Sequence, residues 1–232
     1  MLALAVVILI SYLIGSIPSS IWVAKLKGVD IREHGSGNAG ATNTFRILGW
    51  KPGTVVLLID VFKGFTCSFW VSQLAYHIGS GPISVIPNWE VDPFLQILCG
   101  VIAVIGHMFP ILANFEGGKG MATSTGMLVA IEPISIVIVT VVFLIVMFAF
   151  RYVSLASLVA AFIYPLLLLL LRYGFKVSID GSILIFGAVV GLGIIIKHIG
   201  NIRRLKKGTE NKVGSFKPAQ GWLNKDKKQS VN

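Results

Sequence analysis

Residues 121–150 read MATSTGMLVAIEPISIVIVTVVFLIVMFAF, and the way this stretch divides into segments decides the fold. Pro133–Phe150 has no charged side chain and approaches the ~20 mainly apolar residues that cross a bilayer. Met121–Ile131 is also apolar but too short to cross it alone. We interpret it as a short helix buried among its neighbours, which puts Pro133 at a turn between two antiparallel helices. Without this segment, everything after it lies on the opposite side of the membrane.

The composition of the 232-residue chain is that of a membrane protein. Its mean hydropathy is +0.82. Hydrophobic residues make up 55% of the chain and charged residues only 13%, well below the quarter or so that is usual in soluble domains. Cys67 and Cys99 both fall in apolar runs, so neither a disulfide framework nor a metal cluster is indicated.

Five further apolar runs have the length of a membrane span. The first resembles the core of a signal peptide, but no basic residue precedes it and its apolar pattern continues to Lys25. We therefore interpret it as a retained span with an external N-terminus. Together with Met121–Ile131 and Pro133–Phe150, the five runs give seven segments. They are Leu2–Ala24, Gly53–His77, Phe94–Ala113, Leu155–Leu171 and Ser182–Lys197.

The distribution of charge favours seven segments over six, because basic loops remain on the cytoplasmic side. With seven, most cations and the basic tail from Lys197 share one side, and the other side keeps only Arg172 and Lys176 as basic residues. With six, the N-terminal loops and the tail lie on opposite sides. We predict an all-α, polytopic membrane protein with seven transmembrane helices, an external N-terminus and a cytoplasmic C-terminus. The cytoplasmic cations before the tail are Lys25, Lys27, Arg32, Arg46, Lys51, Lys119 and Arg151, and the external acids are Glu90, Asp92, Glu132 and Asp180.

This topology brings the polar segments to the cytoplasmic side. The first is the glycine-rich stretch His34–Asn43, HGSGNAGATN, which Arg46 follows at helical spacing. Its glycines and short hydroxyl and amide side chains leave backbone N–H groups and small donors accessible to an anionic oxygen. The stretch predicts a site for a phosphorylated small molecule.

Three further polar segments share this side. Asn114–Gly120 places Lys119 among three glycines, but it is not a P-loop, because no hydroxyl residue follows the lysine. A flexible turn with its lysine among the lipid headgroups is the alternative interpretation. The others are the corner Arg151–Ser154 and the start of the tail, where His198 and Asn201 share a helix face.

Six motifs occur in order between the first span and Glu210. They are Ser36–Asn43 with Arg46, Asp60-x-x-Lys63-Gly64, Gly106-His107-x-Phe109-Pro110, Gly117–Gly120 with Ala122-Thr123, Arg151-Tyr152-x-Ser154-Leu155, and Asn201-Ile202-x-Arg204-Leu205 with Gly208–Glu210. As a set they resemble the motifs of the bacterial acyl-phosphate:glycerol-3-phosphate acyltransferases.

The resemblance implies a seven-helix protein of the bacterial inner membrane, with its main motifs on the cytoplasmic face. It also implies a reaction, in which an acyl group passes from acyl phosphate to the 1-hydroxyl of sn-glycerol 3-phosphate and gives lysophosphatidate and phosphate. We expect an integral membrane acyltransferase domain at residues 1–210 and a basic cytoplasmic tail at 211–232. Apart from its substrates and membrane lipids no partner is indicated, nucleic acid included, and the sequence does not indicate an oligomeric state.

The resemblance and the chemistry of the side chains give the motifs roles. Both substrates carry phosphate, so two anion sites must lie close together. Acyl phosphate already has a good leaving group, so positioning and charge stabilisation supply most of the rate, and we expect neither a cofactor nor a metal. Which loop binds which phosphate stays open. The expected substrate-binding residues are Ser36, Gly37, Asn38, Thr42, Asn43, Arg46, Gly118, Gly120, Ser154 and Arg204, and the expected catalytic residues are Lys119, His198 and Asn201.

The proton of the attacking hydroxyl has two candidate acceptors. His198 is the convincing protein base, because an imidazole titrates near the working pH, and Asn201 would help to orient the hydroxyl. A phosphate of the substrates is the alternative. Lys119 is expected to neutralise charge on the acyl phosphate or the leaving group.

Two other functional classes compete with acyl transfer. A transporter of an organic phosphate is the first, but the glycine-rich motifs are unlike one another and give no sign of the inverted repeats common in transporters. A non-catalytic lipid-binding scaffold is the second, and it leaves Arg46, Lys119 and Asn201 unexplained.

Overall fold

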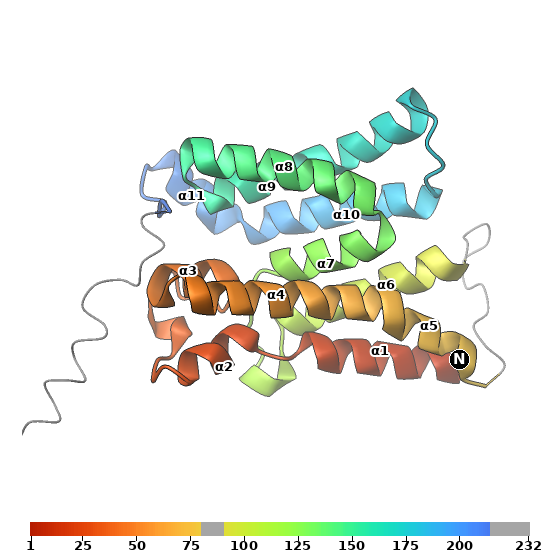
Figure 1. Cartoon of the computed structure of the whole chain (residues 1–232), viewed down its shortest axis with the longest axis horizontal. Helices are drawn as coiled ribbons and strands as arrows, with labels where there is room; N and C mark the ends of the chain where they lie inside the picture. The colour runs from red at the N-terminus through yellow and green to blue at the C-terminus, as the bar shows by residue number, and fades with distance from the viewer. Residues whose placement is uncertain (80–90, 214–232) are drawn as a thin grey trace, which may run out of the picture.

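The computed structural model describes residues 1–79 and 91–213, and within these ranges every regular element is a helix (Figure 1). The expected external acid Glu90 and the part of the expected tail beyond residue 213 lie outside the described residues. The elements are α1 Leu2–Gly15, α2 Ser19–Lys25, η1 Ile31–Glu33, α3 Ala41–Leu48, α4 Trp50–Thr66, η2 Cys67–Val71, α5 Ser72–Leu74, η3 Ala75–His77, α6 Val91–Met108, η4 Ile111–Ala113, α7 Met121–Ile131, α8 Pro133–Phe150, α9 Val153–Leu169, η5 Leu170–Gly174, α10 Gly181–Lys197 and α11 Ile199–Lys206.

Most of these elements join into apolar stretches of membrane-spanning length. The α10 and α11 helices form a further candidate span, with a bend of 55° between them. The expected bounds differ from the observed ones by only a few residues. An all-helical membrane fold is therefore confirmed, whereas the crossing of the membrane by seven segments and the orientation of the termini stay predictions. The five continuous stretches among the described residues are Leu2–Lys25, Trp50–His77, Val91–Ala113, Pro133–Phe150 and Val153–Gly174.

The short α7 helix lies between two layers of longer helices. The α1, α4 and α6 helices lie on one side of it and α8, α9 and α10 on the other (Figure 1). Its contact with α4 depends on glycine, because a Cβ atom at Gly64 would lie 2.0 Å from the Thr123 carbonyl oxygen and one at Gly126 would lie 1.8 Å from the Val61 carbonyl oxygen. Small residues let helix backbones approach this closely in membrane proteins.

The turn into α8 follows the predicted pattern. Pro133 occupies the first turn of α8, where its missing N–H costs no intrahelical hydrogen bond. The carboxylate of Glu132 caps the helix by accepting a hydrogen bond of 3.4 Å from the Ser135 amide. The α7 helix thus reverses directly into α8, as the sequence predicts.

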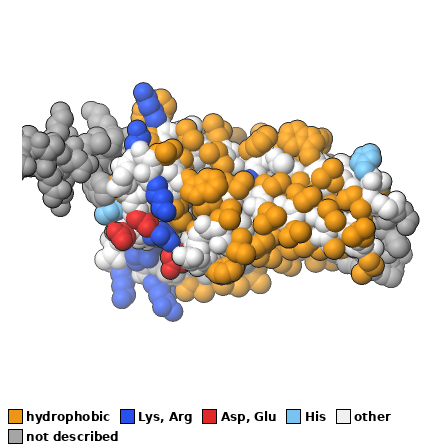
Figure 2. Space-filling view, turned by 90° about the horizontal axis from the view of Figure 1, so that it is seen from below, with side chains coloured by type: hydrophobic (Ala, Val, Ile, Leu, Met, Phe, Trp, Pro, Cys, Tyr) orange, Lys and Arg blue, Asp and Glu red, His pale blue; other side chains and the backbone are white. Residues whose placement is uncertain are grey.

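Charged and hydrophobic side chains occupy different parts of the surface along the long axis of the protein. Hydrophobic side chains cover most of its length, while Lys, Arg, Asp and Glu gather at one end (Figure 2). On α8, the side chains of Val141, Ile145 and Phe148 are 52%, 62% and 67% exposed, which suits contact with lipid acyl chains. The charged end contains α2, α3 and α11 (Figures 1 and 2).

A cluster of buried polar groups ties α2, α4 and α6 together near this end. The Asp60 carboxylate lies 3.0 Å from the Lys63 ammonium and accepts a hydrogen bond of 2.7 Å from the Ser19 hydroxyl. Lys63 also donates to the Ile17 carbonyl oxygen at 3.1 Å, and its Nζ lies 2.8 Å from Nδ1 of His107. Asp60 and Lys63 thus form an ion pair within the second apolar stretch, and their hydrogen-bond partners satisfy groups that would be costly to bury alone.

Candidate functional site

A cavity of about 760 Å³ opens among the loops and helix ends of the charged end. Its polar part lies between two glycine-rich segments, the start of α9 and the bend between α10 and α11. The first glycine-rich segment is His34–Asn43 and the second is Asn114–Gly120. From there the cavity continues as an apolar branch between the helices. Of the expected site residues, only Gly118 is outside its lining. The lining contains Ser36, Gly37, Asn38, Thr42, Asn43, Arg46, Lys119, Gly120, Ser154, His198, Asn201 and Arg204.

The first glycine-rich segment is shaped by Asn43. Its amide nitrogen donates to the Ile31 and His34 carbonyl oxygens at 3.0 and 2.9 Å, and its amide oxygen accepts from the Ser36 backbone N–H at 3.0 Å. Gly35 adopts φ +62°, and a Cβ atom there would lie 2.4 Å from the Asn43 oxygen. Asn43 therefore supports the loop, and a phosphate contact by its side chain stays a prediction.

The α3 helix presents its N-terminus to the cavity. It begins after Gly40, and no side-chain hydrogen bond caps its first turn. The unpaired N–H groups of a first turn favour an anion. Thr42 in this turn is exposed, and Arg46 lies one turn later and is half-buried. Burial lowers the pKa of Arg46 while the carboxylate of Glu210 opposes that shift, and a guanidinium stays protonated in proteins.

The second glycine-rich segment packs against α6 and against the first glycine-rich segment. The Gly118 N–H donates to the His107 carbonyl oxygen at 3.1 Å. A Cβ atom at Gly118 would lie 2.1 Å from Nε2 of His107 and 2.8 Å from the Ala39 carbonyl oxygen, so no larger residue fits. Gly118 thus packs behind the cavity wall, whereas Gly120, with φ +81°, starts α7 at the cavity.

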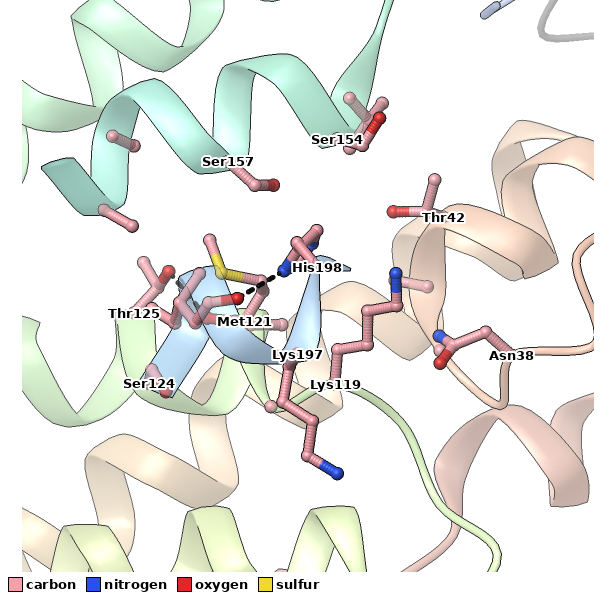
Figure 3. A pocket seen from close by; sticks show the side chains of 18 of the residues that line it. Asn38, Thr42, Lys119, Met121, Ser124, Thr125, Ser154, Ser157, Lys197 and His198 are labelled. Atoms are coloured by element: carbon pink, nitrogen blue, oxygen red, sulfur yellow. Dashed lines mark hydrogen bonds between the residues drawn. The ribbon is translucent and has the colours of Figure 1, made fainter. Parts of the chain in front are cut away.

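This packing fixes the place of Lys119. Its side chain extends toward Thr42 and Asn38, whereas Lys197 points in the opposite direction (Figure 3). Its ammonium donates to the side-chain oxygen of Asn201. Burial, reinforced by the positive charge of Arg204, lowers the pKa of Lys119 to about 8.

Glu210 links the last two motifs, and it was not among the expected site residues. Its carboxylate accepts hydrogen bonds from Ser154 at 2.9 Å, from Asn201 at 2.8 Å and from Arg204 at 2.6 Å. Burial alone would raise the pKa of this carboxyl, but the three hydrogen bonds and the charge of Arg204 outweigh burial and lower the pKa. Asn201 therefore bridges Glu210 and Lys119, and one hydrogen-bonded chain connects α9, α11 and the second glycine-rich segment.

His198 lies at the bend between α10 and α11, directly after the last residue of α10. Its Nδ1 atom lies 2.8 Å from the Ile194 carbonyl oxygen. Because a carbonyl oxygen only accepts, Nδ1 carries the hydrogen and Nε2 keeps its lone pair. The side chain is buried, and burial together with the charge of Lys119 lowers the pKa of His198 to about 4. A neutral imidazole with a free acceptor nitrogen therefore lines the cavity at physiological pH.

The polar part of the cavity has an excess of positive charge. Four cations, on Arg46, Lys119, Lys197 and Arg204, line the cavity together with two carboxylates, on Asp60 and Glu210. Such an arrangement can hold two phosphate groups next to each other, with a neutral imidazole beside them.

Two of the buried groups behind this charge escaped the assignment of the site from sequence. Asp60 and His107 also line the cavity, although neither was among the expected site residues. Glu210 stood within a motif, and the signal that could have singled it out was its position as an isolated acid directly after the basic run of α11.

Comparison with known proteins identifies relatives over nearly the whole chain. A family model described as glycerol-3-phosphate acyltransferase matches residues 5–208. The glycerol-3-phosphate acyltransferase of Salinibacter ruber is 48% identical over 227 residues, which cover 96% of this chain and 98% of that protein. The enzyme of the same name from Chlorobium limicola is 44% identical over 233 residues, covering 92% and 97%.

Solved structures with a similar fold carry a related name. The crystal structure of PlsY (YgiH), an integral membrane glycerol 3-phosphate acyltransferase, in its glycerol 3-phosphate form, matches with a TM-score of 0.76 and 36% identity and covers 91% of this chain and 96% of its own. The lysophosphatidic acid form of PlsY matches with a TM-score of 0.73 and 34% identity, covering 92% and 97%.

Proposed function

The chain belongs to the glycerol-3-phosphate acyltransferase family, and from this premise we propose that acyl phosphate is the donor in its reaction. The protein is an integral membrane enzyme that transfers an acyl group to glycerol 3-phosphate. Its product is then lysophosphatidate, and inorganic phosphate is the leaving group. Transport of an organic phosphate is not favoured, because the relatives over nearly the full length are acyltransferases.

The observation that carries the proposal is the dual character of the cavity. Its polar end gathers Arg46, Lys119 and Arg204, and its remainder is apolar and runs between the helices. An acyl phosphate is a phosphate joined directly to a fatty chain, so it matches both parts at once. A volume of about 760 Å³ is within the range of pockets that enclose small ligands.

The two phosphates divide between the two glycine-rich segments in this proposal. The glycerol 3-phosphate phosphate binds at the N-terminus of α3, with donors from Ser36, Asn38 and Thr42 and the charge of Arg46. The acyl phosphate binds with its phosphate near Lys119 and Arg204, and its chain enters the apolar branch. The charge of Lys119 is then next to the oxygen on which negative charge develops as phosphate leaves.

The reaction itself is a displacement at the acyl carbon. The 1-hydroxyl oxygen of glycerol 3-phosphate forms a bond to this carbon, and the bond from the carbon to the phosphate oxygen breaks. Nε2 of His198 takes the hydroxyl proton, or a phosphate takes it directly. Asn201 holds Lys119 through its oxygen and is itself held by Glu210, so it acts as a positioning residue in this arrangement.

The proposal includes the orientation of the protein. The charged end, which contains the cavity, faces the cytoplasm of a bacterial inner membrane, and seven segments separate an external N-terminus from a cytoplasmic C-terminus. The clustering of basic residues at that end supports this orientation (Figure 2).

The donor is tested with purified protein in detergent, labelled glycerol 3-phosphate, and either palmitoyl phosphate or palmitoyl-coenzyme A. We expect labelled lysophosphatidate only with palmitoyl phosphate. Product from the thioester alone would contradict the proposed donor and leave the family assignment intact.

A further inference from the structure

The apolar branch of the cavity runs among α7, α8, α9 and α10. Leu128, Val139, Ala160 and Ala161 line it although each is at least nine-tenths buried, so this part of the cavity lies beneath the lipid-facing surface. The branch therefore continues inward from the phosphate-binding end and is not merely a groove on the outside.

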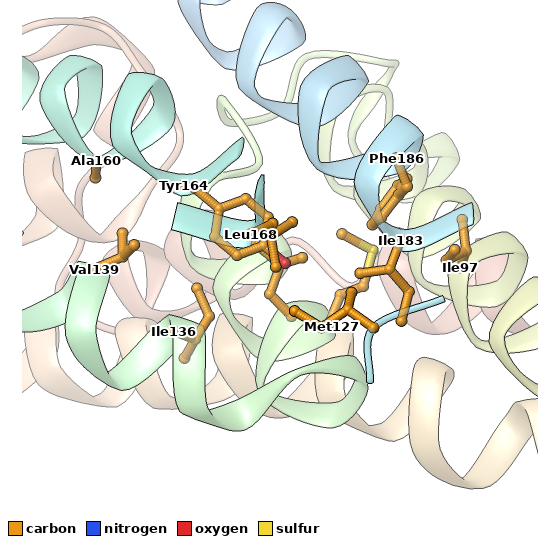
Figure 4. Packing of buried hydrophobic residues seen from close by; sticks show 11 residues of the cluster. Ile97, Met127, Ile136, Val139, Ala160, Tyr164, Leu168, Ile183 and Phe186 are labelled. Carbon is orange, nitrogen blue, oxygen red and sulfur yellow. The ribbon is translucent and has the colours of Figure 1, made fainter. Parts of the chain in front are cut away.

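Along α9 the side chains that line the branch are small until Tyr164. Val153, Ser154 and Ser157 come first, then Ala160 and Ala161, and Tyr164 is the first aromatic residue. Figure 4 shows Ala160 and Val139 apart from the bulky group formed by Tyr164, Leu168, Met127 and Ile183. The cavity is thus lined by the serines and alanines and reaches Tyr164, whereas Met127, Leu168 and Ile183 are outside its lining.

The ring of Tyr164 is held by its neighbours. A Cβ atom at Gly187 of α10 would lie 3.2 Å from Cε1 of Tyr164, so the ring packs against the bare backbone of that glycine. Ala161 likewise packs on α10, because a Cβ atom at Gly191 would lie 2.5 Å from its carbonyl oxygen. The Tyr164 hydroxyl has no hydrogen-bond partner among the described residues. Packing rather than hydrogen bonding therefore sets the position of the ring.

The length of the branch matches a fatty chain. Ser154 and Tyr164 are ten residues apart, which is about 15 Å along a helix. An extended hydrocarbon chain advances about 1.25 Å per C–C bond, so about 12 carbons fit beside this part of α9. A chain of fatty-acid length bound with its phosphate at Lys119 thus brings its methyl end to Tyr164.

We propose that Tyr164 sets the acyl-chain length that the enzyme prefers, by closing the inner end of the acyl-binding branch. This inference rests on the proposed function only for the identity of the donor as a fatty acyl phosphate. The competing path runs sideways, because the cavity is also lined by Leu58 of α4 and Leu144 of α8, which are 62% and 40% exposed. A chain that left between α4 and α8 would enter lipid and would not meet Tyr164.

The test compares kcat/KM for a series from decanoyl to eicosanoyl phosphate in wild type and Tyr164→Ala. Removing the ring lengthens the branch, so the optimum should move to chains longer by about two to four carbons. Each methylene newly buried contributes about a fourfold gain, so the ratio of long-chain to medium-chain kcat/KM should rise at least about tenfold. A profile that is unchanged in Tyr164→Ala would overturn the proposal and favour the sideways path.

Three further variants test whether a change in chain-length preference comes from the Tyr164 ring. Ala160→Leu fills the branch one turn before Tyr164 and should shift the optimum to shorter chains, and a longer optimum would contradict the proposal. Tyr164→Phe keeps the ring and should keep the wild-type profile. Leu168→Ala removes a fully buried side chain of the same helix that does not line the cavity, so it should lower the unfolding temperature without moving the profile.

The same measurements separate the inference from the proposed function. If wild type transfers no acyl group from any acyl phosphate, the proposed donor is wrong. If wild type transfers them and the Leu168→Ala profile shifts as much as that of Tyr164→Ala, the donor stands and Tyr164 has no particular role.

Discussion

Lys119 is placed where its charge can be lost near physiological pH, and this gives a pH prediction. Its pKa is lowered to about 8, chiefly by burial. The ammonium is charged below that pH and neutral above it, and the substrate phosphates need the charge. We expect kcat/KM for glycerol 3-phosphate, which reports the free enzyme, to fall by about tenfold per pH unit above pH 8.

The control for this fall of kcat/KM above pH 8 is a variant whose cation does not titrate in the same pH range. In Lys119→Arg the fall above pH 8 should disappear, even if absolute activity is lower, because a guanidinium remains charged. Lys197→Arg changes a lysine that points away from Lys119, and in this variant kcat/KM should still fall above pH 8. If kcat/KM still falls above pH 8 in Lys119→Arg, the fall must come from the titration of another group.

His198 gives the second prediction at this scale. Its Nε2 lone pair is free because Nδ1 bonds to the Ile194 carbonyl oxygen, so it can receive the proton of the attacking hydroxyl. His198→Ala should lower kcat by ~10²-fold or more if the imidazole is the base. His77→Ala, at the opposite end of the molecule, serves as the control. Near-normal turnover of His198→Ala in purified protein would transfer the role to a substrate phosphate.

Side-chain chemistry predicted most of the residues that line the site, but it predicted their structural roles less well. Lys119, His198 and Asn201 were expected together and line one cavity. The three hydrogen bonds of Asn43 and the role of Glu210 were not predicted, because both depend on how loops distant in sequence fold back onto each other. Spacing along a chain does not contain that information.

At the scale of elements, the crossing of α4 and α7 yields a stability prediction. A methyl group at Gly126 would lie 1.8 Å from the Val61 carbonyl oxygen, so the two helices must separate to accommodate it. Overpacking of this kind costs about 1–3 kcal/mol. We expect Gly126→Ala to lower the unfolding temperature in detergent clearly.

The α10 helix offers a matched control. Apart from its chain neighbours and the backbone of its own helix, no described atom lies within 4 Å of a Cβ atom added at Gly193, so Gly193→Ala changes the same residue type in an apolar helix without a clash. It should leave the unfolding temperature unchanged or raise it slightly. Equal destabilisation by the two variants would show that close packing of α4 on α7 is not what Gly126 provides.

The helices were predicted within a few residues because long apolar runs are a strong and local signal. The short α7 helix required a second argument, from charge. Two breaks were harder to predict, namely the interruption of the first span before α2 and the 55° bend between α10 and α11. The first falls at Pro18, which cannot continue the hydrogen bonds of α1 and stands at the start of α2. The angle of the second depends on how the surrounding helices pack.

At the scale of the whole molecule, the charged end should face the cytoplasm. The prediction is tested with single cysteines at Lys27 and His77, two exposed positions at opposite ends. A membrane-impermeant thiol reagent added to intact cells should label His77→Cys and leave Lys27→Cys unlabelled until the membrane is opened. Cys67 and Cys99 are buried, so they give a low background. The reverse labelling pattern would overturn the proposed orientation.

The distribution of charge along the chain also predicted that one end would hold all the polar motifs. Figure 2 shows the result as a charged end beside a hydrophobic belt. The extent of the apolar branch could not be predicted in this way, since it is the space left where four helices fail to fill the interior, and only their arrangement defines it.

Transfer from acyl phosphate is tested most directly by stoichiometry. Purified protein is given palmitoyl phosphate and labelled glycerol 3-phosphate, and inorganic phosphate and lysophosphatidate are measured in the same sample over time. We expect the two products to appear together in equal amounts, and both to depend on Lys119. Phosphate released without lysophosphatidate, or lysophosphatidate formed without release of phosphate, would contradict acyl transfer from acyl phosphate at this site.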